Sequence, residues 1–266
     1  MNEKIYNNIG INYSINRTAD QRIVASIVEL LNLPVGSIIA DIGAGTGNYS
    51  NALANLGYKI KAIEPSEEMQ RQAVSNNNVD WYLASAESIP LPDHSVDGVL
   101  IVLAIHHFSS LQAAAKEIRR VCPNGPIVAF TLDPRQGEEP WFKKYFPEAY
   151  QKDFISFPPI DEVGDMIAAA EGWEKTIRKF PLPHDLLDKN MYSGWNKPEI
   201  YLDHQFRQNV SGLALASKSV VQKGIESLKN DLETGKWNEK FGYLRKQISF
   251  DVGFRFIKCV KSKQEM

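Results

Sequence analysis

The sequence predicts an α/β fold in which helices cover both faces of a mostly parallel sheet. Two observations carry this prediction. Short apolar runs alternate with segments whose apolar residues recur at helical spacing. The runs are apolar at nearly every position, as strands are when both faces of their sheet are covered.

The expected elements follow one another closely. Apolar runs predict strands at 37–42, 59–64, 79–84, 96–103, 126–132, about 174–182 and 247–260. Helical spacing predicts helices at 19–33, 47–56, 66–75, 111–121 and 161–171. Thr18 or Asp20 can cap the first of these helices, because both side chains accept hydrogen bonds from a helix N-terminus.

Two aromatic segments interrupt this alternation. Residues 133–160 combine charges, prolines and aromatic rings, and residues 185–241 are expected to be largely helical with further aromatic rings. Ligands of open parallel sheets bind beyond the carboxyl ends of the strands. We therefore expect both segments to fold over that edge of the sheet as lids, although each single ring is equally compatible with plain packing.

Composition and charge argue against several classes of protein. A net charge of −2 provides no basic field for nucleic acid or for an anionic membrane. The longest apolar stretch, 99–105, is far shorter than a membrane span, and the N-terminal residues contain no apolar signal core. Cys122 and Cys259 form no metal or redox motif, which suits a reducing compartment. A cytoplasmic protein without a metal centre is expected.

The most informative motif is the glycine loop after the first strand, Asp41-Ile42-Gly43-Ala44-Gly45-Thr46-Gly47. A phosphate-binding P-loop requires a lysine that this loop lacks. A dinucleotide site prefers GxGxxG, whereas this chain has GxGxG with an acid directly before it. A carboxylate at Asp41 would sit poorly beside a pyrophosphate but well beside an ammonium group. S-adenosylmethionine offers that group, and NAD remains the less favoured ligand.

With this loop the sequence resembles the class I S-adenosylmethionine-dependent methyltransferases. The resemblance is strongest to the branch of the ubiquinone and menaquinone biosynthesis methyltransferases and many small-molecule methyltransferases. It covers residues 5–132 by motif and the final strand by topology. It implies a Rossmann-like, seven-stranded sheet whose last strand is antiparallel. We expect one domain over 1–266, with a cofactor-binding half at 1–132 and lid insertions at 133–160 and 185–241.

The resemblance also implies roles for the first two strand ends. The glycine loop would hold the methionine part of the cofactor, and Asp41 would help to orient its amine. The loop residues concerned are Gly43, Ala44, Gly45 and Gly47. Glu64, which ends the second strand, would bind both ribose hydroxyls, because one carboxylate can accept two charge-assisted hydrogen bonds. Met69 in the following helix would pack on the adenine.

The run 84–92 resembles the third motif of the family, which flanks the adenine. The family usually has Gly-Asp where this chain has Ala84-Ser85. The hydroxyl of Ser85 can still accept the bond from the adenine amino group, but more weakly than a carboxylate, so the adenine contact is expected to be weaker than the ribose contact. The other cofactor-binding positions that the resemblance implies are Pro65, Ala86, Glu87 and Leu103.

Two histidines follow the strand at 96–103 and are the candidate catalytic residues. An imidazole titrates near pH ~6.5 and can accept a proton at neutral pH. His106 is preferred over His107 because it lies nearer the strand end, and packing of one ring in the loop is the alternative. In the N-terminal segment, Tyr6 or Tyr13 would shield the sulfonium, and Arg17 would meet the methionine carboxylate.

These observations predict transfer of a methyl group from S-adenosylmethionine to a small organic acceptor by in-line displacement, with S-adenosylhomocysteine as product. The accepting atom would be oxygen, nitrogen or an activated carbon. The alternatives are a protein that binds S-adenosylmethionine without turnover and, less favoured, an NAD-dependent oxidoreductase. A monomer or homodimer with a small-molecule partner is expected, without nucleic acid or membrane.

Overall fold

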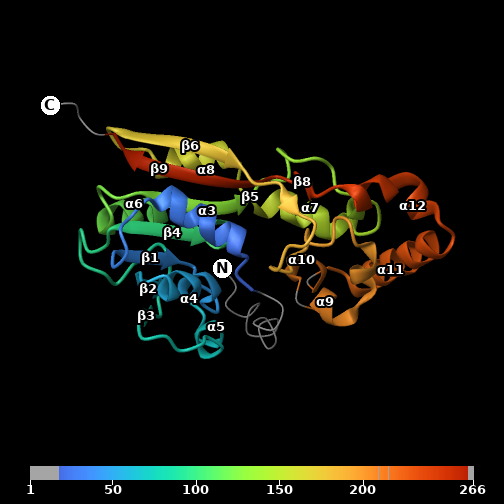
Figure 1. Cartoon of the computed structure of the whole chain (residues 1–266), viewed down its shortest axis with the longest axis horizontal. Coiled ribbons are helices and arrows are strands. Elements are labelled where there is room, and N and C mark those ends of the chain that lie inside the picture. The colour runs from blue at the N-terminus through green and yellow to red at the C-terminus, as the bar shows by residue number, and fades with distance from the viewer. Residues whose placement is uncertain (1–17, 209, 215, 263–266) are drawn as a thin grey trace.

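The structure, a computed structural model, describes residues 18–208, 210–214 and 216–262. Figure 1 shows a twisted sheet flanked by helices and, beside it, a lobe made mainly of helices. The sheet has seven strands in the order β3-β2-β1-β4-β5-β9-β6. The chain reverses its direction of winding between β1 and β4, the point at which open sheets of this kind bind their ligands.

The strands confirm the predicted topology. Their bounds are β1 Ile38–Ile42, β2 Lys59–Ile63, β3 Val79–Tyr82, β4 Gly98–Val102, β5 Ile127–Leu132, β6 Trp173–Lys179 and β9 Phe254–Lys261. The first five pair in parallel, whereas β9 is antiparallel to both β5 and β6. The structure therefore confirms the predicted sheet, which is mostly parallel with an antiparallel last strand.

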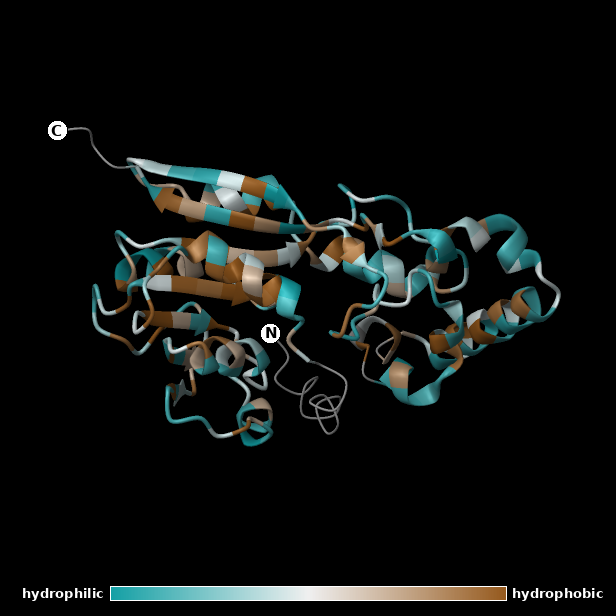
Figure 2. Cartoon of the chain, in the orientation of Figure 1, coloured by the Kyte–Doolittle hydropathy of each residue, from teal (hydrophilic) through white to brown (hydrophobic). Residues whose placement is uncertain are grey.

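Helices cover both faces of the sheet, which explains the continuous apolar strands. Helices α3 (Gln21–Leu31) and α4 (Asn48–Asn55) pack on one face against residues such as Ile39 and Phe130. Helices α6 (Leu111–Val121) and α8 (Ile160–Ile167) pack on the other against Ile101 and Ala129. Figure 2 shows β4 in apolar colours along its length, as burial between two helical layers requires.

The lobe consists of helices around an aromatic core. Its elements are η3 Trp141–Lys144, α7 Pro147–Ser156, η4 Pro198–Leu202, α9 His204–Gln208, α10 Ser211–Ala214, α11 Lys218–Glu233, α12 Lys236–Phe241 and η5 Gly242–Lys246. The Trp141 ring meets those of Tyr201 and Trp237 edge to face, with centroids 5.1 and 5.5 Å away. Its indole N–H donates to the carbonyl of Trp195 at 2.7 Å, so the buried ring has no unsatisfied donor.

Three predicted elements differ from the structure. The helix expected at 66–75 is only α5, Glu67–Arg71. Residues 185–197, expected to be helical, form turns. Gly194 in this stretch packs so closely on Tyr201 that a Cβ at position 194 would lie 2.5 Å from the Tyr201 ring. The strand expected at 247–260 is divided into β8 (Ser249–Phe250), which pairs with β7 (Leu182–Pro183), and β9. Gly253 separates the two strands with a φ of +106°, a conformation that favours glycine.

Candidate cofactor cavity

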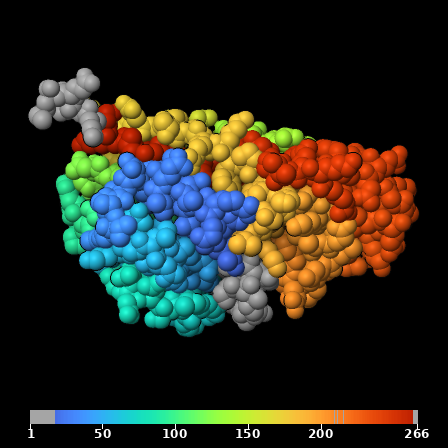
Figure 3. All heavy atoms as spheres, in the orientation of Figure 1, coloured from blue at the N-terminus to red at the C-terminus, as the bar shows by residue number. Residues whose placement is uncertain are grey.

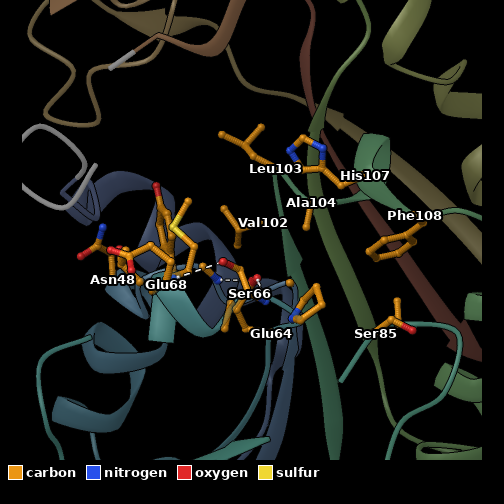
Figure 4. Close-up of a pocket in the computed structure, with 18 of the residues that line it drawn as sticks. Asn48, Glu64, Ser66, Glu68, Ser85, Val102, Leu103, Ala104, His107 and Phe108 are labelled. Atoms are coloured by element: carbon orange, nitrogen blue, oxygen red, sulfur yellow. Dashed lines mark hydrogen bonds between the residues drawn. The ribbon is translucent and has the colours of Figure 1, made fainter. Parts of the chain in front are cut away.

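A cavity of about 720 Å³ opens at the carboxyl ends of β1 to β4 (Figure 4). Four loops that follow these strands provide most of its wall, and Thr18 and Asp188 complete it. The residues of these loops and of the adjoining helix and strand ends that line it are Gly43, Ala44, Gly45, Thr46, Asn48, Tyr49, Glu64, Pro65, Ser66, Glu67, Glu68, Met69, Arg71, Leu83, Ser85, Ala86, Glu87, Val102, Leu103, Ala104, His107, Phe108 and Ser109.

Two glycines of the loop after β1 have different surroundings: Gly43 lies close to Ala104, whereas Gly45 faces open space. Gly43 has a φ of +74°, and a Cβ there would lie well inside 3.0 Å of the Ala104 Cβ. Gly45 has a φ of +58°, but no atom lies within 4 Å of the position that a Cβ would take there, so the space above it is open. Gly43 therefore holds the loop against β4, whereas Gly45 leaves room for a ligand to approach the backbone.

Asp41 and Gly47 lie behind the loop and are not among the residues that line the cavity. Asp41 is 2% exposed and accepts a hydrogen bond from Ser50 Oγ at 2.6 Å. Burial raises the pKa of Asp41 to about 6, and the nearby charge of Glu64 adds to this effect. Gly47 caps α4, and a Cβ there would lie 2.7 Å from the ring of Trp81. The structure thus gives both residues a supporting position.

Glu64 presents a buried carboxylate to the cavity. Its Oε2 accepts the N–H of Gly45 at 2.8 Å and its Oε1 accepts the N–H of Ser66 at 2.9 Å. Burial raises the pKa of Glu64, and these two backbone hydrogen bonds oppose the rise. Each carboxylate oxygen accepts more than one hydrogen bond, so acceptor capacity remains for a ligand hydroxyl. Pro65 and Met69 line the wall beside it.

The loop after β3 brings Ser85, Ala86 and Glu87 to the cavity, as predicted for the third motif. Glu87 also fastens this loop to the start of α6, because its Oε1 accepts the backbone N–H groups of Ser109 at 2.6 Å and Ser110 at 3.1 Å. Burial favours a higher pKa for Glu87, but the hydrogen bonds from Ser110 and Ser109 outweigh it and lower the pKa.

The structure brings His107, and not His106, to the cavity. Both belong to the short 3₁₀ helix η2, Ile105–His107, in which successive side chains point about 120° apart. His106 packs against Phe157, with ring centroids 4.0 Å apart, and is not part of the wall. The cavity is therefore lined by His107 and not by the preferred His106, and a role as base for either ring stays a prediction. Burial lowers the pKa of His107 to about 4, which keeps its imidazole neutral at pH 7.

Leu103 occupies a strained position beside His107. Its φ of +51° lies in the left-handed region, and its N–H donates to the carbonyl of Phe130 at 2.8 Å. Figure 4 shows Leu103 and His107 on one side of the cavity and Glu64 and Ser66 on the opposite side. Strained residues of this kind cost of order 1–3 kcal/mol and cluster at functional sites.

The sequence did not indicate that Thr18 and Asp188 line the cavity. No local motif distinguishes Asp188, because only the folded chain brings it to the cavity. Tyr13 and Arg17 lie outside the described residues, as does Tyr6. Within the described ranges no group of three or more His, Cys, Asp or Glu residues could hold a metal ion. None of the helices described there combines the length and apolar character that a membrane crossing requires.

Comparison with known proteins identifies relatives of this architecture. The family model described as "Methyltransferase domain" matches residues 40–130. The ubiquinone/menaquinone biosynthesis C-methyltransferase UbiE of Rubrivivax gelatinosus is 30% identical over 153 residues, which are 55% of this chain and 57% of that protein. The match thus spans little more than half the length of this curated relative.

A solved structure extends the likeness over nearly the whole chain. A putative methyltransferase from an antibiotic biosynthesis pathway of Anabaena variabilis is 44% identical, with a TM-score of 0.88 over 91% of this chain and 98% of that one. The [4+2]-cyclase SpnF shares the fold at 16% identity, with a TM-score of 0.61 over 97% of this chain and 93% of that one. The glycine loop, the sheet order and these relatives together show that the chain belongs to the class I S-adenosylmethionine-dependent methyltransferases.

Proposed function

We propose that this protein transfers a methyl group from S-adenosylmethionine to a small organic acceptor and releases S-adenosylhomocysteine. The observation that carries the proposal is the open space above Gly45, directly beside the buried carboxylate of Glu64, in a cavity of about 720 Å³. Small-molecule sites of this kind are concave and have few but well-placed polar groups.

The residues of the wall fit the cofactor of the family. Glu64 offers a carboxylate for the two ribose hydroxyls, and Gly45 leaves room for the methionine part to lie against the loop. Met69 and Leu83 offer apolar surface for the adenine, while Ser85 offers a hydroxyl. When bound, the cofactor supplies a methyl group on a sulfonium, ready for displacement by a nucleophile.

His107 is proposed to accept a proton or a hydrogen bond from the acceptor. Its neutral ring adds no positive charge beside a sulfonium cation, with which an imidazolium would clash. Burial makes His107 a weaker base, so it suits acceptors with an acidic proton, such as phenols or carbons between two carbonyl groups. Leu103 beside it would position the acceptor through apolar contact.

The segments 133–160 and 185–241 are proposed to form the acceptor side of the site. Their aromatic side chains build a lobe with its own packed core, and Asp188 from this lobe lines the cavity. The names of two relatives support a small metabolite as acceptor, since one is a C-methyltransferase of quinone biosynthesis and the other is assigned to an antibiotic pathway. Oxygen, nitrogen and activated carbon all remain acceptor atoms of the proposal.

Binding alone does not test this proposal, because the fold also occurs in a [4+2]-cyclase. Calorimetric titration with S-adenosylmethionine and S-adenosylhomocysteine comes first, followed by a mass-spectrometric screen for methylated products with phenols, amines and carbonyl-activated carbons. Formation of S-adenosylhomocysteine together with a methylated product supports the proposal. Tight binding without turnover of any acceptor would favour a non-catalytic binding protein, and binding of NAD alone would contradict both.

His106 and His107 form a matched pair for the catalytic role. His107→Gln should lower kcat by about 10²–10⁴-fold if the ring acts as a base, with the affinity for S-adenosylhomocysteine unchanged. His106→Gln should leave kcat within about threefold, because His106 packs on Phe157 and does not line the cavity. Equal turnover of the two variants, with an unchanged pH profile, would exclude His107 as the base.

A further inference from the structure

Leu103 has a backbone conformation that its residue type rarely adopts. Among the residues that the structure describes, three other than glycine have a positive φ: Asn32 at 48°, His94 at 54° and Leu103 at 51°. Asparagine and histidine are enriched in this left-handed region, whereas the Cβ of a leucine crowds the following carbonyl oxygen. Leucine at position 103 thus carries a cost that glycine or asparagine would reduce, which points to a use of its side chain.

The positive φ decides which face of the sheet the Leu103 side chain joins. Successive side chains of a strand point to opposite faces. In β4, Val99 and Ile101 pack in the apolar cluster under α6 and α8, whereas Leu100 packs in the other cluster. Regular alternation would send Leu103 to the face of Ile101, but it packs with Val102 against the cluster of Leu100. The left-handed residue thus keeps this side chain away from α6 and in the cavity wall.

Leu103 lies on the side of the cavity that carries His107. Figure 4 shows these two side chains next to each other, opposite Glu64. The cluster that Leu103 packs against continues from α3 into the lobe, and Figure 3 shows these two parts in contact at the molecular surface. The N–H of Leu103 donates to the carbonyl of Phe130 at 2.8 Å, so the neighbouring strand fixes the turn.

A branched apolar side chain at this place affects which acceptors can bind. In the proposed function the acceptor lies within reach of His107, so Leu103 would touch the atoms next to the one that is methylated. A hydroxyl or a charge on those atoms would lose its water to a side chain that forms no hydrogen bonds. Uncompensated burial of a hydroxyl weakens binding by about 5- to 100-fold.

We propose that Leu103 determines acceptor specificity, by selecting acceptors that are apolar next to the methylated atom and disfavouring those with a hydroxyl or a charge there. The inference rests on the proposed function, because it takes the His107 side of the cavity as the place of the acceptor. It also explains the strained backbone, since the residues that would relax it, glycine and asparagine, both lack an apolar branched side chain.

The test compares two phenols, ortho-cresol and salicyl alcohol, which differ by one hydroxyl on the carbon attached next to the phenol group. Ligand-observed NMR measures their dissociation constants for the protein saturated with S-adenosylhomocysteine, so the test needs no turnover. The wild type should bind ortho-cresol at least about 5-fold more tightly. Leu103→Asn has a similar size, suits the left-handed backbone and offers an amide to the hydroxyl, so this preference should fall by at least about 5-fold.

Leu83→Asn is the matched control, because it makes the same substitution elsewhere in the cavity wall. Leu83 follows β3, and β2 and β1 lie between β3 and β4, so these two strands are roughly 14 Å apart. Leu83→Asn should therefore leave the preference between the phenols within about twofold of the wild type. An equal fall in both variants would contradict a specific role of Leu103.

Three results would overturn the inference and leave the proposed function intact. They are equal binding of the two phenols by the wild type, failure of its S-adenosylhomocysteine complex to bind either phenol, and an unchanged preference in Leu103→Asn. Failure of the wild type to bind S-adenosylhomocysteine and S-adenosylmethionine would overturn the proposed function and this inference together. If Leu103→Asn does not fold, as judged by circular dichroism, Leu103→Gly relaxes the same backbone and removes the side chain, and an unchanged preference in it contradicts the inference.

Discussion

Replacement of Gly43 by alanine tests how the glycine loop is held. The new Cβ would lie well inside 3.0 Å of the Ala104 Cβ, although carbon atoms in contact normally stay ~3.5–4.0 Å apart. Two costs add. The left-handed backbone at φ +74° costs about 1–2 kcal/mol for an L-residue, and overpacking costs about 1–3 kcal/mol. We expect Gly43→Ala to lower the free energy of unfolding by about 2–5 kcal/mol.

The assay is urea unfolding followed by circular dichroism, with Gly172→Ala as the matched control. Gly172 has nearly the same φ, +76°, but no atom lies within 4 Å of its Cβ position. Its replacement therefore carries the backbone cost without the overlap, and the difference between the two variants isolates the contact with Ala104. If Gly43→Ala is no more destabilising than Gly172→Ala, the close approach of the loop to β4 is not what requires glycine at position 43.

Three other predictions concern the cavity and its buried charges. Gly45→Ala should lower the free energy of unfolding by only about 1–2 kcal/mol. Its Cβ enters the open space of the cavity, so calorimetry should show S-adenosylhomocysteine binding at least ~10-fold more weakly, and an unchanged affinity would contradict this. The folded state binds His107's proton less tightly than the unfolded state does, so the wild type should lose up to ~3 kcal/mol of stability as the pH falls from 6.5 to 4. His107→Gln should remove that loss in urea titrations at each pH, and an identical slope in both proteins would refute the assignment. For Asp41 the change of stability with pH has the opposite sign. Its folded-state pKa is raised to about 6, so the buried charged form is costly at pH 7. The free energy of unfolding therefore gains from Asp41 as the pH falls through 6 toward 3.8. Asp41→Asn should therefore raise stability at pH 7 by up to ~3 kcal/mol, and a loss of stability there would contradict the desolvation argument.

The sheet was predictable because its strands carry their own signal. Strand β5, Ile127–Leu132, is buried at every position, so the apolar run and the strand almost coincide. The same holds for the three glycines of the loop after β1, whose positive φ values follow from their local spacing. These features depend on residues that are adjacent in sequence.

Other features were not predictable because they depend on contacts between distant segments. Apolar and aromatic residues at 185–197 suggested a helix, but Gly194 packs tightly against Tyr201 and the chain turns there. The choice between His106 and His107 depends on how η2 rotates against Phe157. Asp188 lines the cavity, and the residues beside it in sequence bond to Asp20 and Arg22, which lie far away in the sequence.

The position of β9 has a consequence for synthesis in the cell. This strand lies between β5 and β6, although it is made after the whole lobe. A ribosome therefore releases β5 with one edge unpaired, and every residue of that strand is buried in the folded protein. Unpaired apolar edges recruit other chains, so the nascent protein needs protection by chaperones until β9 emerges. Chains whose translation stops before residue 254 should aggregate.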